Sequence, residues 1–458
     1  MMTEDTIAGI STAVGQSGIS IIRLSGPEAF EIVDQVFRGR ETVKNQPSHT
    51  VRYGKIYSDE GEVLDEVLLT KMAAPRTYTR ENVVEVSCHG GYTLARALLD
   101  LLYQKGARPA EPGEFTKRAF LNGRIDLAQA EAVMDVIQAR TERVSKVAVR
   151  QLEGALSEKI NRIREKLIGL LSHIEVNLDY PEYDVEEITL SQAQKEAEAV
   201  VEELSRLIES FRYGKVLREG LEVVIAGRPN VGKSSLMNRL ARKNKSIVTD
   251  IPGTTRDVVE EYVNIKGIPV KLMDTAGVHH TEDYVEQLGV ERTLKAIEDA
   301  DFIIVLEDAS SPSGSLEDTI KKRVDEAGKP LVQVFNKIDL IHSPEQSKLK
   351  EANPQALFLS VSEDKGIEAL EDRLFGFASK NQQDVDNQVL ITNTRHELQL
   401  KKARDYLNTA LEAVHGGLTL DMVALDLKGA LEELGRITGH HADEDVIHAI
   451  FSRFCLGK

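Results

Sequence analysis

The sequence of 458 residues contains only two cysteines, Cys88 and Cys455. Two cysteines exclude a framework of several disulfides and are typical of a protein in a reducing compartment. Long apolar runs are also missing, because the densest apolar stretches, 167–171 and 302–306, are far shorter than the roughly 20 residues that span a bilayer. The amino terminus lacks a basic segment followed by an apolar core, so no signal peptide is predicted. We therefore expect a soluble, cytoplasmic protein.

Positive charge is scarce as well. Lys and Arg number 57 against 74 Asp and Glu, which gives a formal net charge of −17. A protein that coats nucleic acid by charge alone needs clustered Lys and Arg, so this class is excluded, and any nucleic acid would need a local patch or a basic partner. A local excess of cations in 138–166 indicates either solvated helix faces or a contact surface for RNA, and the sequence does not separate the two.

The order of patterns along the chain predicts its domains. Hydrophobic residues make up 41%, enough for cores, and at roughly 150 residues per domain the length suggests about three domains. Residues 1–118 mix strand patterns with turn signals, whereas 119–216 and 381–458 have apolar residues at helical spacing. Residues 217–380 alternate short apolar runs with helical patterns, as in a doubly wound parallel sheet. The predicted fold is a mixed α/β amino-terminal domain and a helical domain into which an α/β domain is inserted.

A glycine-rich loop follows the first apolar run of the inserted domain, 221–226. The loop, Gly-Arg-Pro-Asn-Val-Gly-Lys-Ser at 227–234, precedes a helical pattern, which is the context that a phosphate-binding loop requires. Its backbone N–H groups surround the β-phosphate, Lys233 reaches the β- and γ-phosphates as a catalytic residue, and the Ser234 hydroxyl binds Mg²⁺. The residues expected to bind nucleotide here are Asn230, Val231, Gly232, Lys233, Ser234 and Ser235.

Two further boxes end predicted strands in the same domain. Asp-Thr-Ala-Gly at 274–277 places Asp274 to hold Mg²⁺ through water and Gly277 to sense the γ-phosphate. Asn-Lys-Ile-Asp at 336–339 ends in a carboxylate, which can accept hydrogen bonds from N1–H and the 2-amino group of guanine that adenine cannot supply. We therefore predict GTP as the nucleotide. The expected contacts are Asp274, Thr275, Ala276, Gly277, Asn336, Lys337, Asp339 and Ser360.

The segment 249–257 lies between the first two boxes and reads Thr-Asp-Ile-Pro-Gly-Thr-Thr-Arg-Asp. A Thr in such a segment completes the coordination of Mg²⁺ when the γ-phosphate is present. Thr254 and Thr255 are the candidates, and we favour Thr255 because it follows the turn at Gly253. The residues expected to contact the nucleotide are Thr249, Asp250, Ile251, Pro252, Gly253, Thr254 and Thr255.

These boxes together resemble the Era-like, translation-factor-related GTPases. Three other features make the resemblance more specific: the insertion into a helical domain, the tail Phe-Cys-Leu-Gly-Lys at 454–458, and the motifs at 113–122 and 126–131, which ordinary GTPases lack. With them, the whole chain resembles the MnmE (TrmE) family of tRNA-modification GTPases.

The resemblance implies a catalytic mechanism. Val278 stands where Ras-like proteins place a water-orienting Gln, so hydrolysis needs another device. Proteins of this family use a potassium ion in place of an arginine finger, with the G domains of a homodimer meeting across the nucleotide. Their water-orienting carboxylate corresponds to Glu286. Their potassium ligands correspond to Asn230, Thr249, Ile251 and Thr254.

The resemblance also implies that residues 1–118 support dimerisation and bind a tetrahydrofolate one-carbon donor such as 5-formyltetrahydrofolate. At Arg124 many relatives carry Lys, which keeps the charge but alters the donor geometry. Cys455 is either a nucleophile toward a uridine base or a small packing residue. The pair His440-His441 and the acids after it form either a metal site or a polar helix start. The family's folate contacts correspond to Arg23, Glu85, Arg124 and Lys458.

The implied function is a potassium-dependent GTPase that works with the FAD-containing flavoprotein MnmG as a heterotetramer. The pair would install an aminomethyl or carboxymethylaminomethyl group at C5 of wobble uridines in certain tRNAs. One rival is an Era-like ribosome-assembly switch without modification chemistry, but the tail offers no RNA-binding module for it. A second rival is a folate-dependent transferase that uses GTP only for regulation.

Overall fold

The computed structural model divides the chain into two compact units. The first comprises Met1–Met134, Gln151–Glu198 and Lys402–Lys458, and the second comprises Asp135–Arg150 and Ala199–Lys401. The structure describes residues 5–13, 15–179, 186–243, 261–274, 296–311, 314–379, 389–417, 419–455 and 457, with 186–193, 261, 274 and 315 described by their backbone alone. Within these ranges, none of the helices combines the length and the apolar character needed to cross a bilayer.

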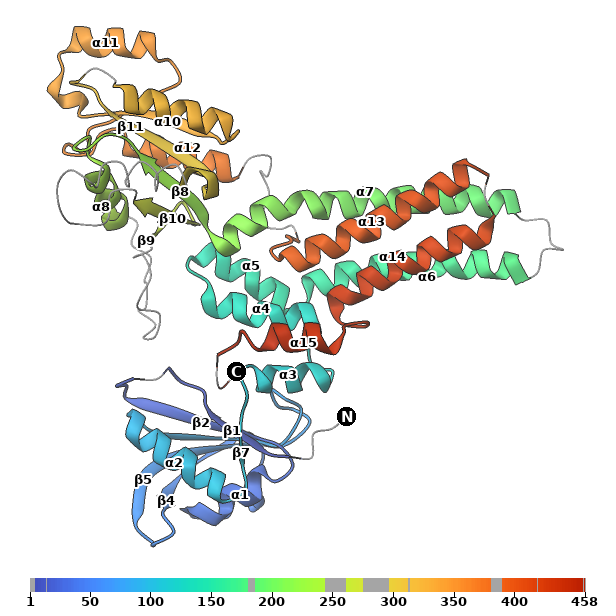
Figure 1. The fold of residues 1–458 in the computed structure, drawn as a ribbon. Helices are drawn as coiled ribbons and strands as arrows, with labels where there is room; N and C mark the ends of the chain where they lie inside the picture. Colours follow the sequence, from blue (N-terminus) through green and yellow to red (C-terminus); the bar gives the residue numbers. More distant parts are fainter. Residues whose placement is uncertain are drawn as a thin grey trace. The chain divides into compact units, whose positions relative to one another are not determined.

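A seven-stranded sheet forms the amino-terminal part of the first unit, in the order β3-β4-β5-β6-β2-β1-β7. Neighbouring strands are antiparallel except for β1 and β7. Helices α1 (Ala29–Val36) and α2 (Tyr92–Gln104) pack on it (Figure 1). The strands are β1 (Ile7–Ile10), β2 (Ile19–Ser25), β3 (Phe37–Gly39), β4 (Thr50–Tyr57), β5 (Val63–Met72), β6 (Val83–His89) and β7 (Arg108–Pro109).

Alternation along the central strands decides which residues lie on the other face of this sheet. Ile22 and Leu24 of β2 are fully buried in the core under the helices. Successive side chains of a strand point to opposite faces, so Arg23 points away from that core. Glu85 of β6 is the direct cross-strand partner of Arg23, and the buried Val84 and Val86 flank it. The alternation therefore places the two predicted folate residues side by side.

The first part of the helical region expected at 119–216 is helical but not continuous. It consists of α3 (Glu114–Leu121), α4 (Leu127–Gln138), α5 (Glu142–Leu152) and α6 (Ala155–Asp179). Two of the breaks contain a glycine in the left-handed region, Gly123 with φ 69° and Gly154 with φ 100°. Apolar spacing alone did not reveal these breaks, because the periodicity resumes after each of them.

The carboxy-terminal helices complete the first unit. Helix α14 (Leu420–Thr438) lies along α6, and Lys428 of α14 forms a 2.9 Å ion pair with Glu175 of α6. Helix α15 (Glu444–Phe451) packs its Phe451 against Phe120 of α3 in a small apolar cluster. Two long helices, α7 (Glu186–Glu219) and α13 (Thr394–His415), have residues in both units.

A six-stranded sheet forms the centre of the second unit, in the order β13-β12-β11-β8-β10-β9 (Figure 1). All neighbouring pairs are parallel except the β9–β10 hairpin. The short apolar runs expected within 217–380 correspond to these strands, although residues 258–260 of the run expected at 258–265 lie outside the described residues. The strands are β8 (Leu221–Ala226), β9 (Glu261–Ile265), β10 (Ile268–Asp274), β11 (Phe302–Asp308), β12 (Leu331–Asn336) and β13 (Leu357–Phe358).

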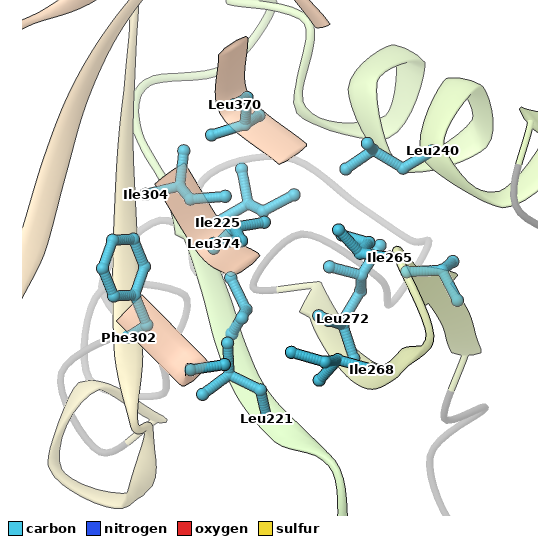
Figure 2. Packing of buried hydrophobic residues seen from close by; sticks show 14 of the residues in the cluster. Leu221, Ile225, Leu240, Ile265, Ile268, Leu272, Phe302, Ile304, Leu370 and Leu374 are labelled. Atoms are coloured by element: carbon cyan, nitrogen blue, oxygen red, sulfur yellow. The ribbon is translucent and has the colours of Figure 1, made fainter. Parts of the chain in front are cut away.

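Helices bury both faces of this parallel sheet, which explains why its central strands are continuous apolar runs. In Figure 2, Ile225 of β8 and Ile304 of β11 lie close to Leu370 and Leu374 of α12, and all four belong to one buried cluster. A second cluster on the other side contains Ile320 of α10. The helices of this domain whose bounds the structure describes are α8 (Lys233–Lys243), α10 (Ser315–Glu326), α11 (Ser343–Ala352) and α12 (Ile367–Ala378). The predicted doubly wound α/β fold is therefore confirmed.

The start of α5 contacts the β9–β10 hairpin within the second unit. The hydroxyl of Thr141 donates a 2.8 Å hydrogen bond to the carbonyl oxygen of Gly267 in the hairpin turn. The guanidinium of Arg140 lies 3.2 Å from the centroid of the Tyr262 ring. In the cation-rich segment, Lys146 pairs with Glu142. Such contacts within the chain favour the interpretation of this segment as helix faces over an RNA surface.

Two helical glycines provide a test of this packing. A Cβ on Gly214 of α7 would lie 2.0 Å from the carbonyl oxygen of Ile391, whereas a Cβ on the exposed Gly169 of α6 would meet nothing within 4 Å. We expect Gly214→Ala to cost about 1–3 kcal/mol through overpacking. Gly169→Ala should instead stabilise by about 0.5–1 kcal/mol, since Ala favours the helix over Gly. Thermal unfolding followed by circular dichroism compares the two, and equal stability of Gly214→Ala and the parent would contradict the packing.

Candidate nucleotide and folate sites

The glycine-rich loop lies at the carboxyl end of β8 and leads directly into α8, which begins at Lys233. Gly232 has φ 101°, and a Cβ there would lie 2.4 Å from the side-chain nitrogen of Asn336. The left-handed backbone and this close approach both require glycine. The loop thus has the form of a phosphate-binding cradle at a helix amino terminus.

Lys233 folds back over this loop. Its Nζ donates to the carbonyl oxygens of Gly227, at 2.7 Å, and of Arg228, at 2.9 Å. The ammonium charge is therefore held where the phosphates of a nucleotide would lie. Ser234 is exposed in the first turn of α8. Asp274 ends β10 in register with Ile225, which lies near the end of β8. Ser234, with its hydroxyl, and Asp274, with its carboxylate, therefore lie at the same edge of the sheet. Oxygen ligands of this kind suit Mg²⁺.

Asn336 connects the phosphate loop to the base-binding boxes. It ends β12 with only 3% of its surface exposed. Its Nδ2 donates to the carbonyl oxygen of Val231 at 2.9 Å, and its Oδ1 accepts from the backbone N–H of Val361 at 3.2 Å. The next residue, Lys337, donates to the carbonyl oxygen of Asn230 at 2.8 Å and pairs with Asp308 at 2.7 Å. Both residues therefore hold the loops in place.

Asp339 follows on an exposed turn of 3₁₀ helix. Hydrogen bonds from the hydroxyls of Ser360 and then Ser362 hold the pKa of its carboxyl below the ordinary value, and the Ser362 hydroxyl lies 3.4 Å from Oδ2. The carboxylate is thus ionised at neutral pH and can accept hydrogen bonds from guanine. Ser360 itself is fully buried, and its Oγ lies 3.0 Å from that of Ser362.

A cavity of about 580 Å³ opens between α8 and these base-binding boxes. Several of its residues were not predicted from the sequence, among them Asn238, Arg239 and Arg242 of α8. These three follow the phosphate loop at helical spacing and could have been found from that spacing. Ser360, which was predicted, is fully buried and is not among the residues that line the cavity. The lining residues are Gly232, Ser235, Asn238, Arg239, Arg242, Asn336, Lys337, Asp339, Leu340, Val361 and Ser362.

Several predicted site residues lie outside the described part of the chain. Asn230 is the described member of the predicted potassium set and adopts a left-handed conformation with φ 65°. Asp274 is described by its backbone alone. The residues outside the described ranges are Thr249, Asp250, Ile251, Pro252, Gly253, Thr254, Thr255, Thr275, Ala276, Gly277, Glu286 and Lys458.

Of the predicted folate residues, Arg23 and Arg124 both lie against Tyr78 in the first unit, and Glu85 pairs with Arg23. Arg23 Nε donates to Glu85 Oε1 at 2.9 Å. The guanidinium of Arg23 lies 5.6 Å from the centroid of the Tyr78 ring, and that of Arg124 lies 4.8 Å from it. Arg23 Nη1 also lies 3.4 Å from the carbonyl oxygen of Gly457, which brings the chain's tail to the same place. Tyr78 was not predicted, because a single aromatic residue in a loop carries no pattern.

Other candidates from the sequence have simpler explanations. Asp443 is the residue before α15, and Glu444 and Asp445 stand in its first turn. Among the described residues there is no group of three or more His, Cys, Asp or Glu that could hold a metal ion. The acidic residues after His441 lie at the amino end of α15, where negative charge is favourable to the helix dipole. Cys455 is exposed beyond the end of α15 and does not pack in a helix.

A phosphate loop, a buried Asn and an ionised Asp at the ends of parallel strands define a P-loop protein that binds guanine nucleotides. The family models of the MnmE helical domain and of the GTP-binding protein TrmE N-terminus match residues 127–455 and 6–124. The chain belongs to the MnmE (TrmE) family of tRNA modification GTPases, which confirms the resemblance seen in the sequence. As a member of this family, it is a GTP hydrolase of tRNA modification.

Relatives with the name tRNA modification GTPase MnmE match over the full length of both chains. The protein of Acetivibrio thermocellus is 49% identical to this chain, and that of Carboxydothermus hydrogenoformans is 48% identical, each over 100% of both chains. The protein of Bacillus cereus is 46% identical, also over 100% of both. The match thus includes the amino-terminal and helical parts as well as the GTPase domain.

The guanine box makes a specific prediction. Asp339→Asn should shift the preference from GTP to xanthosine triphosphate by about tenfold or more, because an amide can donate to the 2-oxo group of xanthine but repels the 2-amino group of guanine. Competition of both nucleotides against a fluorescent guanine nucleotide measures this. Asp325→Asn, an exposed Asp on α10, is the matched control. Unchanged GTP affinity in Asp339→Asn would overturn the assignment of Asp339.

Proposed function

We propose that this chain is a Mg²⁺- and K⁺-dependent GTPase that acts with the FAD-containing flavoprotein MnmG. Together they install an aminomethyl or carboxymethylaminomethyl group at C5 of wobble uridines in certain tRNAs, with a tetrahydrofolate one-carbon donor. The observation that carries the proposal is the presence in one chain of a guanine-nucleotide cavity and of the cluster of Arg23, Glu85 and Tyr78. The names of the relatives favour this reading over a ribosome-assembly switch.

The nucleotide is held by groups already in place. Lys233 and the backbone N–H groups of its loop bind the β- and γ-phosphates, and Asp339 binds the guanine edge. Ser234 and Thr255 would hold Mg²⁺ directly and Asp274 through water. The ion, when bound, would neutralise negative charge on the phosphate oxygens.

A monovalent cation would complete the charge balance. Its predicted ligands are Asn230, Thr249, Ile251 and Thr254, and when bound it would supply the positive charge that an arginine finger supplies elsewhere. Glu286 orients the attacking water, since Val278 has no polar group for that task. We therefore expect Glu286→Ala to slow hydrolysis but to leave GTP binding nearly intact, because the interaction is made with the water. Single-turnover rates and GTP titrations measure the two effects. If Glu286→Ala hydrolyses GTP at the rate of the parent, Glu286 is a surface charge without a role in hydrolysis.

Replacing potassium with sodium tests the cation. At constant ionic strength we expect turnover to fall at least about tenfold, which is about 1.4 kcal/mol of barrier. Asn230→Ala should be slow in both salts, because it removes one of the proposed ligands. Steady-state phosphate release provides the measurement. Equal rates of the parent in the two salts would exclude the cation mechanism.

The face of the amino-terminal sheet that carries Arg23 and Glu85 supports the proposed homodimer. Tyr53 pairs with Leu68 across β4 and β5, and Leu68 pairs with Ser87, two residues from Glu85 on the same face. Tyr53 is 58% exposed and Leu68 is 48% exposed. Large apolar side chains gathered on one open face are typical of an interaction surface. We assign this face to a second copy of the chain.

The Arg23–Glu85 pair provides the chemistry for a folate. A Glu carboxylate accepts hydrogen bonds from the donor edge of a pterin, and Arg124 can bind a carboxylate of the glutamyl tail. Tyr78 offers an aromatic ring beside the two guanidinium groups for contact with a planar ligand. Lys458 would add a further positive charge at the end of the tail.

Calorimetry with 5-formyltetrahydrofolate tests this site directly. Glu85→Ala should weaken binding at least about tenfold, because a charge-assisted hydrogen bond to a partly buried carboxylate is worth on the order of 2 kcal/mol. Glu31→Ala removes an exposed carboxylate of α1 that is paired with Lys44, away from this face, and should bind like the parent. GTP hydrolysis should be unchanged in both variants. Absence of folate binding by the parent at millimolar ligand would refute the one-carbon role.

A further inference from the structure

Two walls of the nucleotide cavity come from parts of the chain that are far apart in sequence. One wall is the face of α8 that carries Ser235, Asn238 and Arg239. The other contains Val361 and Ser362, which belong to the loop 360–366; we refer to this loop as the base loop. Helix α8 starts in the phosphate loop, so any contact between the walls links the phosphate end of the site to its base end.

Arg239 makes such a contact with the base loop. Its Nε donates to Asp364 Oδ1 at 2.8 Å, and its Nη2 pairs with Asp364 Oδ2. Two parallel hydrogen bonds between a guanidinium and a carboxylate fix the orientation of both groups. Asp364 has φ 57°, a left-handed conformation that Asp tolerates better than most residues. The loop therefore turns at Asp364 in the way that presents its carboxylate to α8.

Several other contacts hold the base loop near its ends. Val361 N–H donates to Asn336 Oδ1 at 3.2 Å, and Ser360 and Lys365 exchange two backbone hydrogen bonds of 3.0 Å. These contacts close the loop upon itself and upon β12. The contact with Arg239 acts at a different point, because it attaches the tip of the loop to the helix that binds the phosphates.

An exposed ion pair normally contributes little to stability, since solvent screens it. The Arg239 and Asp364 side chains are 28% and 48% exposed, so the pair falls between an exposed and a buried one. Its bidentate geometry and the rigid helix that carries Arg239 are the conditions under which such a pair restrains a loop. Each partner also favours the charged form of the other: the pKa of Asp364 is lowered by the hydrogen bond from Arg239.

We propose that Arg239 is a positioning residue of the nucleotide site: through Asp364 it holds the base loop against α8 and thereby slows the departure of guanine nucleotide. Val361 and Ser362 then stay in place beside Asp339 while the nucleotide is bound. Loss of the pair lets the loop move away from the base without any change in the phosphate loop. The effect should appear in the residence time of the nucleotide.

The rate of GDP dissociation tests this proposal. A fluorescent GDP is displaced by excess unlabelled GDP in a stopped-flow instrument, with the full-length protein in low salt. We expect Arg239→Ala and Asp364→Ala each to accelerate dissociation about three- to tenfold, and to raise KM for GTP more than they change kcat. Arg323→Ala removes a comparable exposed ion pair, with Glu298 on the far side of the domain, and should leave the dissociation rate as in the parent.

A double-mutant cycle separates positioning from general destabilisation. If the two residues act through each other, Arg239→Ala combined with Asp364→Ala should dissociate GDP no faster than either single variant. The charge swap Arg239→Asp with Asp364→Arg should recover part of the parent's slow rate. Multiplicative effects of the two single substitutions, or parent rates in both, would overturn the proposal. Thermal melting of each variant checks that the domain stays folded. If Arg239→Ala does not fold, Arg239→Gln replaces it in the same measurements.

Discussion

The side-chain amide of Asn336 is the interaction on which the nucleotide site depends. The group is buried, and both of its polar atoms are paired, with the carbonyl of Val231 in the phosphate loop and the N–H of Val361 in the base loop. A buried amide with both partners satisfied fixes a single arrangement, whereas one partner left unpaired would cost stability. The missing Cβ of Gly232 provides the room for this amide. Phosphate and base recognition are thus joined through one side chain.

The parallel sheet makes this connection possible. Strands β8, β10, β11 and β12 run in the same direction, so their carboxyl ends meet at one edge. Residues that are more than a hundred positions apart, such as Val231 and Asn336, become neighbours there, as in other open α/β sheets. The hairpin of β9 and β10 returns from that edge to the start of α5, where Thr141 binds its turn. The second strand of this hairpin, β10, runs from the turn to the Asp-Thr-Ala-Gly box. The contact of Thr141 with the turn is therefore separated from the phosphate side of the site by the length of one strand.

The sequence predicted the parts of the molecule that local pattern determines. The strand 221–226, a helix after the glycine-rich loop and the position of Asn336 at a strand end were confirmed, because continuous apolar runs and glycine-rich loops have few alternative structures. The breaks in the helical stretch after Glu114 were not predicted, since apolar spacing continues across them. The cluster around Tyr78 and the pair of Arg239 and Asp364 were not predicted either, because they join residues that only the tertiary fold brings together.

The central claim is that one chain couples hydrolysis of GTP to one-carbon chemistry on tRNA. Mass spectrometry of the nucleosides in total tRNA tests it most directly, in a strain that lacks this chain and in the same strain that carries the intact gene. The account predicts that the aminomethyl and carboxymethylaminomethyl uridines disappear from the first strain and return in the second, while other modified nucleosides keep their levels. Unchanged amounts of these uridines in the strain without the chain would contradict the account.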